Sequence, residues 1–145
     1  MNKNKISIVK KGLEYIGIMG IVGKEHNQTI VNFFKKIGFN NINDDETPWC
    51  TAFINNIMHD LELPKSNTLM ARSWLKMGVP TLKPEMGDIT ILWRGSKESI
   101  FGHVGVYIAS DEKNVYLLGG NQNNGVNISK YPKDRVIGHR SLFID

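Results

Sequence analysis

Cys50 is the only cysteine in the sequence, and it lies at the start of an expected helix. Thr47 is a suitable N-cap, because its oxygen can accept a free backbone N–H, and Pro48 suits the first helical position. A first-turn cysteine lies near the positive end of the helix dipole, which favours the nucleophilic thiolate. The alternative is a small buried hydrophobe, because Cys50 shares an apolar stripe with Phe53, Ile54, Ile57, Met58 and Leu61.

A nucleophilic cysteine needs a base, and His103 is the best candidate in the chain. His103 begins an alternating strand over residues 103–108, and the turn at residues 111–114 leads into the next strand. A three-residue loop would place Asn121 opposite His103, whereas a loop of two or four residues would place Gln122 there. Either amide oxygen can accept an imidazole N–H and fix the orientation of the ring.

Gly102 and Gly105 lie on either side of His103, and we expect them to mark the close approach of the helix terminus that bears Cys50. The alternative is a surface histidine without a role. Of the other histidines, we expect His59 to be solvated and His139 to be structural. His26 precedes the second expected helix, and lining a cleft is a minority interpretation for it.

Length and composition indicate one domain over residues 1–145 with an ordinary core. The net charge of +4 is mild and its lysines are scattered, which does not favour nucleic-acid binding. No apolar run is long enough to span a membrane, and Lys10, Lys11 and Glu14 interrupt the apolar N-terminal stretch, unlike a secretory signal. A single cysteine excludes an internal disulfide and the usual cysteine spacings of zinc sites.

The expected elements change from helices to strands along the chain. Helical periodicity predicts helices near residues 5–16, over 30–37, from the Cys50 region to 61, and a short one ending at Gly78 with Ser66 or Asn67 as its cap. Strand patterns follow at 89–93, 103–108, 115–118, 126–128 and 136–143, with Asn123-Asn124-Gly125 as a hairpin turn. This order predicts an α+β fold, with a helical part over about 1–79 packed on a small antiparallel sheet over about 80–145.

Six short motifs occur in an order that resembles the papain-like CHAP and NlpC-type cysteine hydrolases of peptidoglycan, and more closely a compact phage-type lysin branch. They are Gly23-Lys24-Glu25-His26-Asn27, Thr47-Pro48-Trp49-Cys50-Thr51-Ala52-Phe53, Ala71-Arg72-Ser73-Trp74-Leu75, Pro84-Glu85-Met86-Gly87-Asp88-Ile89, Gly102-His103-Val104-Gly105 and Leu118-Gly119-Gly120-Asn121-Gln122.

The resemblance implies that Cys50 is the nucleophile, His103 the base and a residue near 121 the third catalytic member. CHAP enzymes often carry Glu-x-Asn at that point, and this chain has Gly119-x-Asn121. The asparagine supports Asn121, with Gln122 as the alternative. Trp49, Trp93 and His26 are the candidates for substrate contact, with core packing as the more common single role of each tryptophan. We expect no metal or cofactor to be needed.

The expected function is therefore a cysteine peptidase or amidohydrolase acting on bacterial peptidoglycan, most simply a stem-peptide endopeptidase serving as a phage endolysin. The alternatives are an N-acetylmuramoyl-L-alanine amidase of the same fold and a non-catalytic wall-binding module. We expect a monomer that inserts in no membrane and binds no nucleic acid. It would be made in the host bacterial cytoplasm without a signal peptide and act on the cell wall or periplasm after release.

Overall fold

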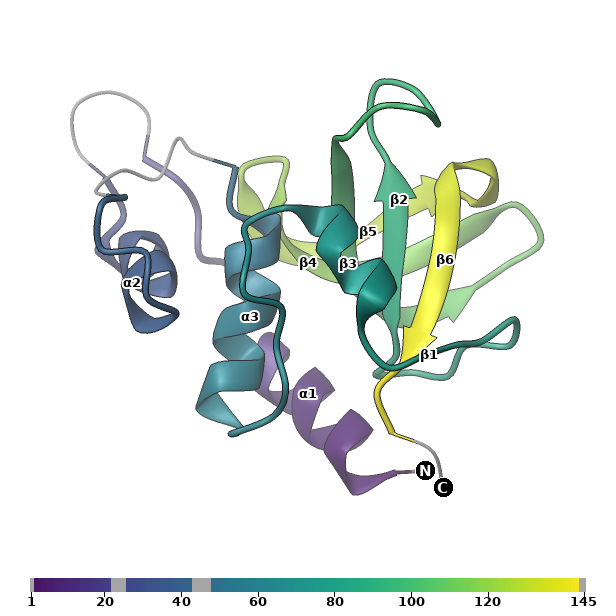
Figure 1. The fold of residues 1–145 in the computed structure, drawn as a ribbon, viewed down its shortest axis with the longest axis horizontal. Coiled ribbons are helices and arrows are strands. Elements are labelled where there is room, and N and C mark those ends of the chain that lie inside the picture. The colour runs from purple at the N-terminus through teal and green to yellow at the C-terminus, as the bar shows by residue number, and fades with distance from the viewer. Residues whose placement is uncertain (1, 22–25, 43–47, 144–145) are drawn as a thin grey trace.

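The computed structural model describes residues 2–21, 26–42 and 48–143, and its elements run from helices to strands along the chain (Figure 1). The helical elements before the sheet are α1 (Lys3–Leu13), α2 (Gln28–Lys36), α3 (Cys50–Asp60) and the 3-10 helix η1 (Ala71–Lys76). The remaining elements are β1 (Val79–Pro80), β2 (Ile89–Trp93), β3 (Gly102–Ser110), β4 (Asn114–Gln122), β5 (Gly125–Pro132), the 3-10 helix η2 (Lys133–Arg135) and β6 (Val136–Ser141).

The strands of the described residues form one antiparallel sheet in the order β1-β6-β2-β3-β4-β5. Strands β2 to β5 pair in sequence order, as a meander does. The turn between β4 and β5 consists of Asn123 and Asn124, which have φ angles of 50° and 59°. Both residues thus have the left-handed backbone conformation that a two-residue type I′ turn requires. Gly125 is not part of the turn, because it is the first residue of β5.

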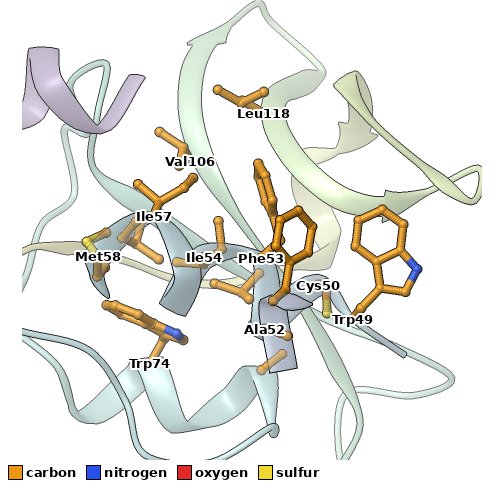
Figure 2. Close-up of a cluster of buried hydrophobic side chains, with 14 of the residues drawn as sticks. Trp49, Cys50, Ala52, Phe53, Ile54, Ile57, Met58, Trp74, Val106 and Leu118 are labelled. Atoms are coloured by element: carbon orange, nitrogen blue, oxygen red, sulfur yellow. The ribbon is translucent and has the colours of Figure 1, made fainter. Parts of the chain in front are cut away.

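Helix α3 is the central helix of the packing, because it contacts α1 and α2 on one side and β3 and β4 on the other. Every residue from Cys50 to Met58 is buried. Figure 2 shows the side chains of this helix packed with Trp74 of η1 and with Val106 and Leu118 of the sheet. The residue at the start of α3 is therefore held between the helical layer and the sheet.

The predicted α+β fold, with helices packed on an antiparallel sheet, is confirmed. Two local predictions are wrong. The first helix begins and ends earlier than predicted, at Lys3 and Leu13. The fourth is a 3-10 helix of 6 residues without a side-chain cap, because Ser66 instead receives a 3.2 Å hydrogen bond from Asn55.

A buried ion pair joins the N-terminal helix to the sheet. Lys5 Nζ lies 3.0 Å from Asp88 Oδ1 and 3.2 Å from Glu85 Oε2, and both Lys5 and Asp88 are buried. Asp88 Oδ2 also accepts the backbone N–H of Glu85 at 2.7 Å. The Gly-Asp motif before β2 thus fixes α1 on the sheet. No helix in the described ranges is long and apolar enough to cross a membrane.

Candidate active site

Cys50 is the first residue of α3, which confirms its predicted position in the first turn. The residue before the helix is Trp49, which makes no side-chain capping hydrogen bond. Pro48 therefore lies before the helix and not, as predicted, at its first position. Thr47, the predicted cap, falls outside the described residues. Cys50 is buried, with 5% of its surface exposed.

The surroundings of Cys50 favour the thiolate. Burial raises the pKa of the thiol, but a hydrogen bond and the positive charge of His103 lower it. The backbone N–H of Val104 and the hydroxyl of Thr51, which lies 3.9 Å from the sulfur, lower it further. The pKa of Cys50 is consequently about 7, below the ordinary 9.0. A large share of the cysteine is thus ionised near neutral pH, as nucleophilic cysteines require.

His103 is buried on β3, with its ring between the thiol and the amide of Gln122. Its Nε2 lies 2.9 Å from Gln122 Oε1 and 3.3 Å from the hydroxyl of Tyr131. Nδ1 makes no hydrogen bond of ordinary geometry within the described part of the chain, so the interaction of His103 with the thiol that lowers the Cys50 pKa is a looser contact. Because Nε2 is occupied, Nδ1 is the nitrogen available to Cys50, and catalytic contacts of this kind are often loose without substrate.

The hydrogen bonds of Gln122 determine which nitrogen of His103 carries the proton. The Gln122 amide nitrogen donates to Leu117 O at 3.1 Å, Asn127 O at 2.8 Å and Asn127 Oδ1 at 3.0 Å. These acceptors hold the amide so that Oε1 faces His103. Since Oε1 only accepts, Nε2 carries a proton whether the ring is charged or neutral, and in the neutral ring Nδ1 presents its lone pair to the thiol.

The amide beside His103 belongs to Gln122 and not to Asn121, which was the favoured prediction. The β3–β4 hairpin starts with the register of a two- or four-residue loop, since Ser110 pairs with Val115, but that register shifts between Tyr107 and Ala109. Val106 therefore pairs with Leu118, a register that would place Asn121 opposite His103. However, the pairing of β4 with β5 shifts between Gly119 and Gln122, and Asn121 has a left-handed φ of 57°. This β-bulge adds a residue to β4 and brings the next side chain, Gln122, to the histidine.

Gly119 provides the space that the Gln122 amide occupies. A Cβ atom at Gly119 would lie 2.4 Å from Gln122 Oε1 and 2.9 Å from Gln122 Cδ. A side chain at position 119 and the observed amide of Gln122 are therefore mutually exclusive. CHAP enzymes often have a glutamate where this chain has Gly119. The glycine leaves room for the Gln122 amide, so the missing glutamate and the presence of Gln122 beside His103 are linked.

The glycines around His103 have different neighbours from those predicted. A Cβ at Gly102 would meet Leu92 O at 2.7 Å, and one at Gly105 would meet Leu117 Cβ at 2.9 Å. These contacts are with neighbouring strands and not with the helix that bears Cys50. The glycine that accommodates α3 is Gly120, where a Cβ would lie 2.7 Å from both Phe53 Cβ and the Trp49 ring.

Comparison with protein families connects this geometry to known proteins. A model described as the CHAP domain matches residues 42–121, which is more than half of the chain and includes Cys50 and His103. The chain belongs to the CHAP domain family. The match ends one residue before Gln122, so the residue that contacts the histidine lies just beyond the part that the family model aligns. A search of curated proteins found no match.

Two solved structures resemble this CHAP domain in fold. An NLP/P60-family protein, described as similar to lipoprotein, from Staphylococcus aureus has a TM-score of 0.57 at 14% identity, covering 100% of this chain and 43% of that one. The peptidoglycan hydrolase RipB from Mycobacterium tuberculosis has a TM-score of 0.59 at 12% identity, covering 99% of this chain and 66% of that one. The CHAP domain thus spans less than two thirds of either protein.

The three predicted substrate-contacting residues do not line the pocket at Cys50. Trp49 is fully buried, with its ring 6.1 Å from that of Phe33, so it belongs to the core. Trp93 is half-buried and donates from Nε1 to Asp134 O at 3.1 Å. His26 lies before α2 and is absent from the pocket lining. Among the other histidines, His59 is exposed as predicted, and His139 is bonded to Thr90 at 2.8 Å.

A pocket of about 240 Å³ opens at Cys50, and its walls are largely apolar. Its exposed apolar residues are Met70 at 48%, Ile100 at 64% and Phe101 at 64%, and the cationic Arg94 lies at its edge. The full lining is Pro48, Cys50, Leu69, Met70, Ala71, Arg94, Ile100, Phe101 and Gly102. Sequence analysis missed these residues; the signal was an apolar Ile100-Phe101 pair within a polar turn directly before the histidine motif.

Arg72 of η1 holds the outer wall of this pocket in place. Its Nε donates to Phe101 O at 2.9 Å, and its NH2 group donates to Ser96 O at 3.4 Å and Lys97 O at 3.2 Å. The planar guanidinium therefore fixes several carbonyls of the β2–β3 loop at once.

Within the described residues, no group of three or more His, Cys, Asp or Glu side chains is arranged to hold a metal ion.

Proposed function

We propose that this CHAP domain is a peptidoglycan hydrolase that cleaves an amide bond with Cys50 as nucleophile, His103 as base and Gln122 as the orienting residue. The observation that carries the proposal is the 2.9 Å hydrogen bond from His103 Nε2 to a fixed Gln122 oxygen, beside a thiol whose pKa is about 7. Membership of the CHAP family and the likeness in fold to RipB, a peptidoglycan hydrolase, support the choice of substrate.

The proposed reaction follows from the positions of these groups. The Cys50 sulfur attacks the amide carbonyl and forms a C–S bond, while His103 Nδ1 holds the proton from the thiol. The free N–H groups at the start of α3, including that of Cys50, bind the oxyanion. Nδ1 then gives its proton to the leaving amine as the C–N bond breaks, and water hydrolyses the thioester. Gln122 Oε1 accepts a hydrogen bond from the Nε2–H group throughout the reaction and so stabilises the imidazolium.

The finer form of the proposal is a stem-peptide endopeptidase that acts as a phage endolysin on the wall of the host. An N-acetylmuramoyl-L-alanine amidase would use the same three residues, since both bonds are amides. The resemblance in sequence motifs supports the endolysin, which would reach the wall from the host cytoplasm after release. The apolar pocket beside Cys50 supports a substrate whose scissile amide is flanked by small apolar groups.

The test uses purified sacculi incubated with the wild type and with Cys50→Ala, His103→Ala and His59→Ala. We expect turbidity loss and released fragments with the wild type and with His59→Ala, which changes an exposed histidine of the same helix as Cys50. Cys50→Ala and His103→Ala should release none. Mass spectrometry of the new ends identifies the bond, with free stem peptides indicating the amidase. Binding of sacculi by the wild type without any release would overturn the proposal and favour a wall-binding module.

A further inference from the structure

Strand β5 carries three polar side chains on one face, the face opposite to that of the buried Val126. Asn127, Ser129 and Tyr131 are half-buried, whereas the intervening Ile128 and Lys130 are exposed. Alternate residues of a strand share a face, so the three polar residues form one stripe. In the pairing with β4, Ser129 lies beside Leu117 and Tyr131 beside Val115, and Tyr131 packs against the core cluster that contains these two residues. The stripe therefore lies on a packed face of the sheet, where its polar groups need hydrogen-bond partners.

Asn127 is bonded to both the backbone and the side chain of Gln122. Its Nδ2 donates to Gln122 O at 2.8 Å, and its Oδ1 accepts from Gln122 Nε2 at 3.0 Å. Ser129 Oγ donates to the same Oδ1, which fixes the orientation of the Asn127 amide. Asn127 therefore supports the β-bulge that brings Gln122 to His103 and the amide orientation that makes Oε1 the acceptor.

Tyr131 contacts His103 directly. Its hydroxyl lies 3.3 Å from Nε2, and the two ring centroids are 5.3 Å apart at an interplanar angle of 41°. Burial raises the pKa of Tyr131 to about 12, with the negative charge of Cys50 raising it and the cations of Arg135 and Arg94 opposing. Tyr131 is therefore a neutral phenol at working pH, and its oxygen is a second acceptor for the Nε2 proton.

Arg135 also contacts the Tyr131 ring. Its guanidinium carbon lies 5.4 Å from the centroid of Tyr131 and 5.7 Å from that of Trp93. It also donates to Trp93 O at 3.1 Å, which joins η2 to the end of β2. The tyrosine ring thus contacts both a fixed cation and the imidazole. A ring held by Arg135 can restrict the orientation of the histidine beside it.

We propose that Asn127 and Tyr131 are positioning residues for His103, Asn127 acting through the Gln122 amide and Tyr131 through its ring and hydroxyl. The inference rests on the proposed function in that His103 is taken to be the base for Cys50. Together the two residues keep the proton on Nε2 and the lone pair of Nδ1 directed at the thiol. When the proton moves from Cys50 to Nδ1, the same two oxygens accept from Nε2 of the imidazolium and stabilise it.

The groups that affect the protonation of the His103 ring come from several elements. Cys50 of α3 and Tyr131 of β5 face His103, while Arg135 of η2 and Arg94 after β2 act on Tyr131. Weaker support of the imidazolium destabilises the thiolate paired with it. Loss of either positioning residue should therefore raise the pH at which Cys50 becomes reactive, and that direction distinguishes positioning from a general loss of structure.

The experiment measures alkylation of Cys50 by iodoacetamide across pH, together with the ¹⁵N shifts of the His103 ring, in the full chain. The variants are Asn127→Leu and Tyr131→Phe, with Lys130→Ala on the exposed face of β5 as the matched control. At pH 7 we expect rates about tenfold lower for Asn127→Leu and about threefold lower for Tyr131→Phe, as lost hydrogen bonds of ordinary strength predict. The inflection should move to higher pH in both, and Lys130→Ala should match the wild type.

Asn127→Asp and the ring spectra separate positioning from misfolding. The aspartate keeps an acceptor for the Gln122 amide, so it should recover most of the rate that Asn127→Leu loses. The neutral wild-type ring should be protonated on Nε2, and Asn127→Leu should show a mixture of both tautomers. Unchanged pH profiles and one unchanged tautomer in Asn127→Leu and Tyr131→Phe would overturn the inference. Because alkylation needs no substrate, this result is independent of whether the wild type degrades sacculi.

Discussion

His103 Nε2 and Gln122 Oε1 lie 2.9 Å apart, and a bulge at Asn121 produces this contact. The amide donates its hydrogens to Leu117 and Asn127, so only its oxygen can face the histidine. The position of the Gln122 amide beside His103 therefore depends on register shifts on both sides of β4, one in its pairing with β3 and one in its pairing with β5.

Substitutions at Asn121 and Gln122 test which of these two neighbouring amides orients His103. Gln122→Ala removes the acceptor of the Nε2 proton, and we expect sacculus hydrolysis to fall about a hundredfold or more. Gln122→Glu should be similarly impaired, because a carboxylate oxygen would face the carbonyls that now accept from the amide. Asn121→Gly keeps the left-handed φ of 57° and should retain activity. A severe loss in Asn121→Gly with an active Gln122→Ala would restore Asn121 as the third residue.

A change at Gly119 tests the space that the amide occupies. Gly119→Ala would place a Cβ 2.4 Å from Gln122 Oε1, so the amide must move from the histidine. Activity should fall about tenfold or more, because overpacking of this kind costs roughly 1–3 kcal/mol. Gly138→Ala, where a Cβ would meet only the end of the Leu75 side chain at 3.2 Å, is the matched control. Recovery of activity in Gly119→Glu combined with Gln122→Ala would show that either position can supply the acceptor.

Sequence patterns predicted the helix that begins at Cys50, strand β2 with its observed bounds, and the histidine at the start of β3, because each depends on local periodicity. They could not separate Asn121 from Gln122. That choice depends on the register shifts in the pairing of β4 with β3 and with β5, and such irregularities in pairing leave no periodic pattern in the sequence.

The residues predicted to contact substrate lie outside the pocket at Cys50 for a related reason. Trp49 is an aromatic residue beside the nucleophile, which suggested substrate contact as well as core packing, and Gly120 leaves space for its ring in the core. The pocket wall instead comes from Ile100 and Phe101, which have no periodic pattern. Their placement depends on Arg72, which is almost thirty residues earlier in the chain and bonds to their loop.

The ionisation of Cys50 gives a pH dependence with a definite sign. The pKa of the thiol is lowered to about 7, so the alkylation rate of the wild type should rise through that pH and level off above it. In His103→Ala the hydrogen bond and charge are lost, while burial, which raises the pKa, remains. The inflection should then move toward or above the ordinary 9.0, with much slower alkylation at pH 7. An inflection near 7 in both proteins would show that His103 does not activate the thiol.

Arg72 should affect substrate binding more than chemistry. Arg72→Ala removes the donors to Phe101 O, Ser96 O and Lys97 O and releases the wall of the pocket. With soluble wall fragments as substrate, we expect KM to rise about tenfold, as the loss of several hydrogen bonds predicts, with a smaller change in kcat. Iodoacetamide, which does not need the wall, should alkylate Cys50 at the wild-type rate. Lys76→Ala, an exposed change in the same 3-10 helix, should alter neither value.

The ion pair between Lys5 and Asp88 should contribute to stability rather than to activity. Lys5→Met leaves the carboxylate of Asp88, which is 2% exposed, without the cation 3.0 Å away. Breaking a buried pair from one side costs about 3 kcal/mol, because the remaining charge stays desolvated. We expect the free energy of unfolding in urea to fall by about that amount, with Cys50 alkylation unchanged at temperatures where the variant is folded. Lys10→Met, an exposed change in the same helix, is the control, and equal stability of the two variants would show that the pair contributes nothing to the attachment of α1.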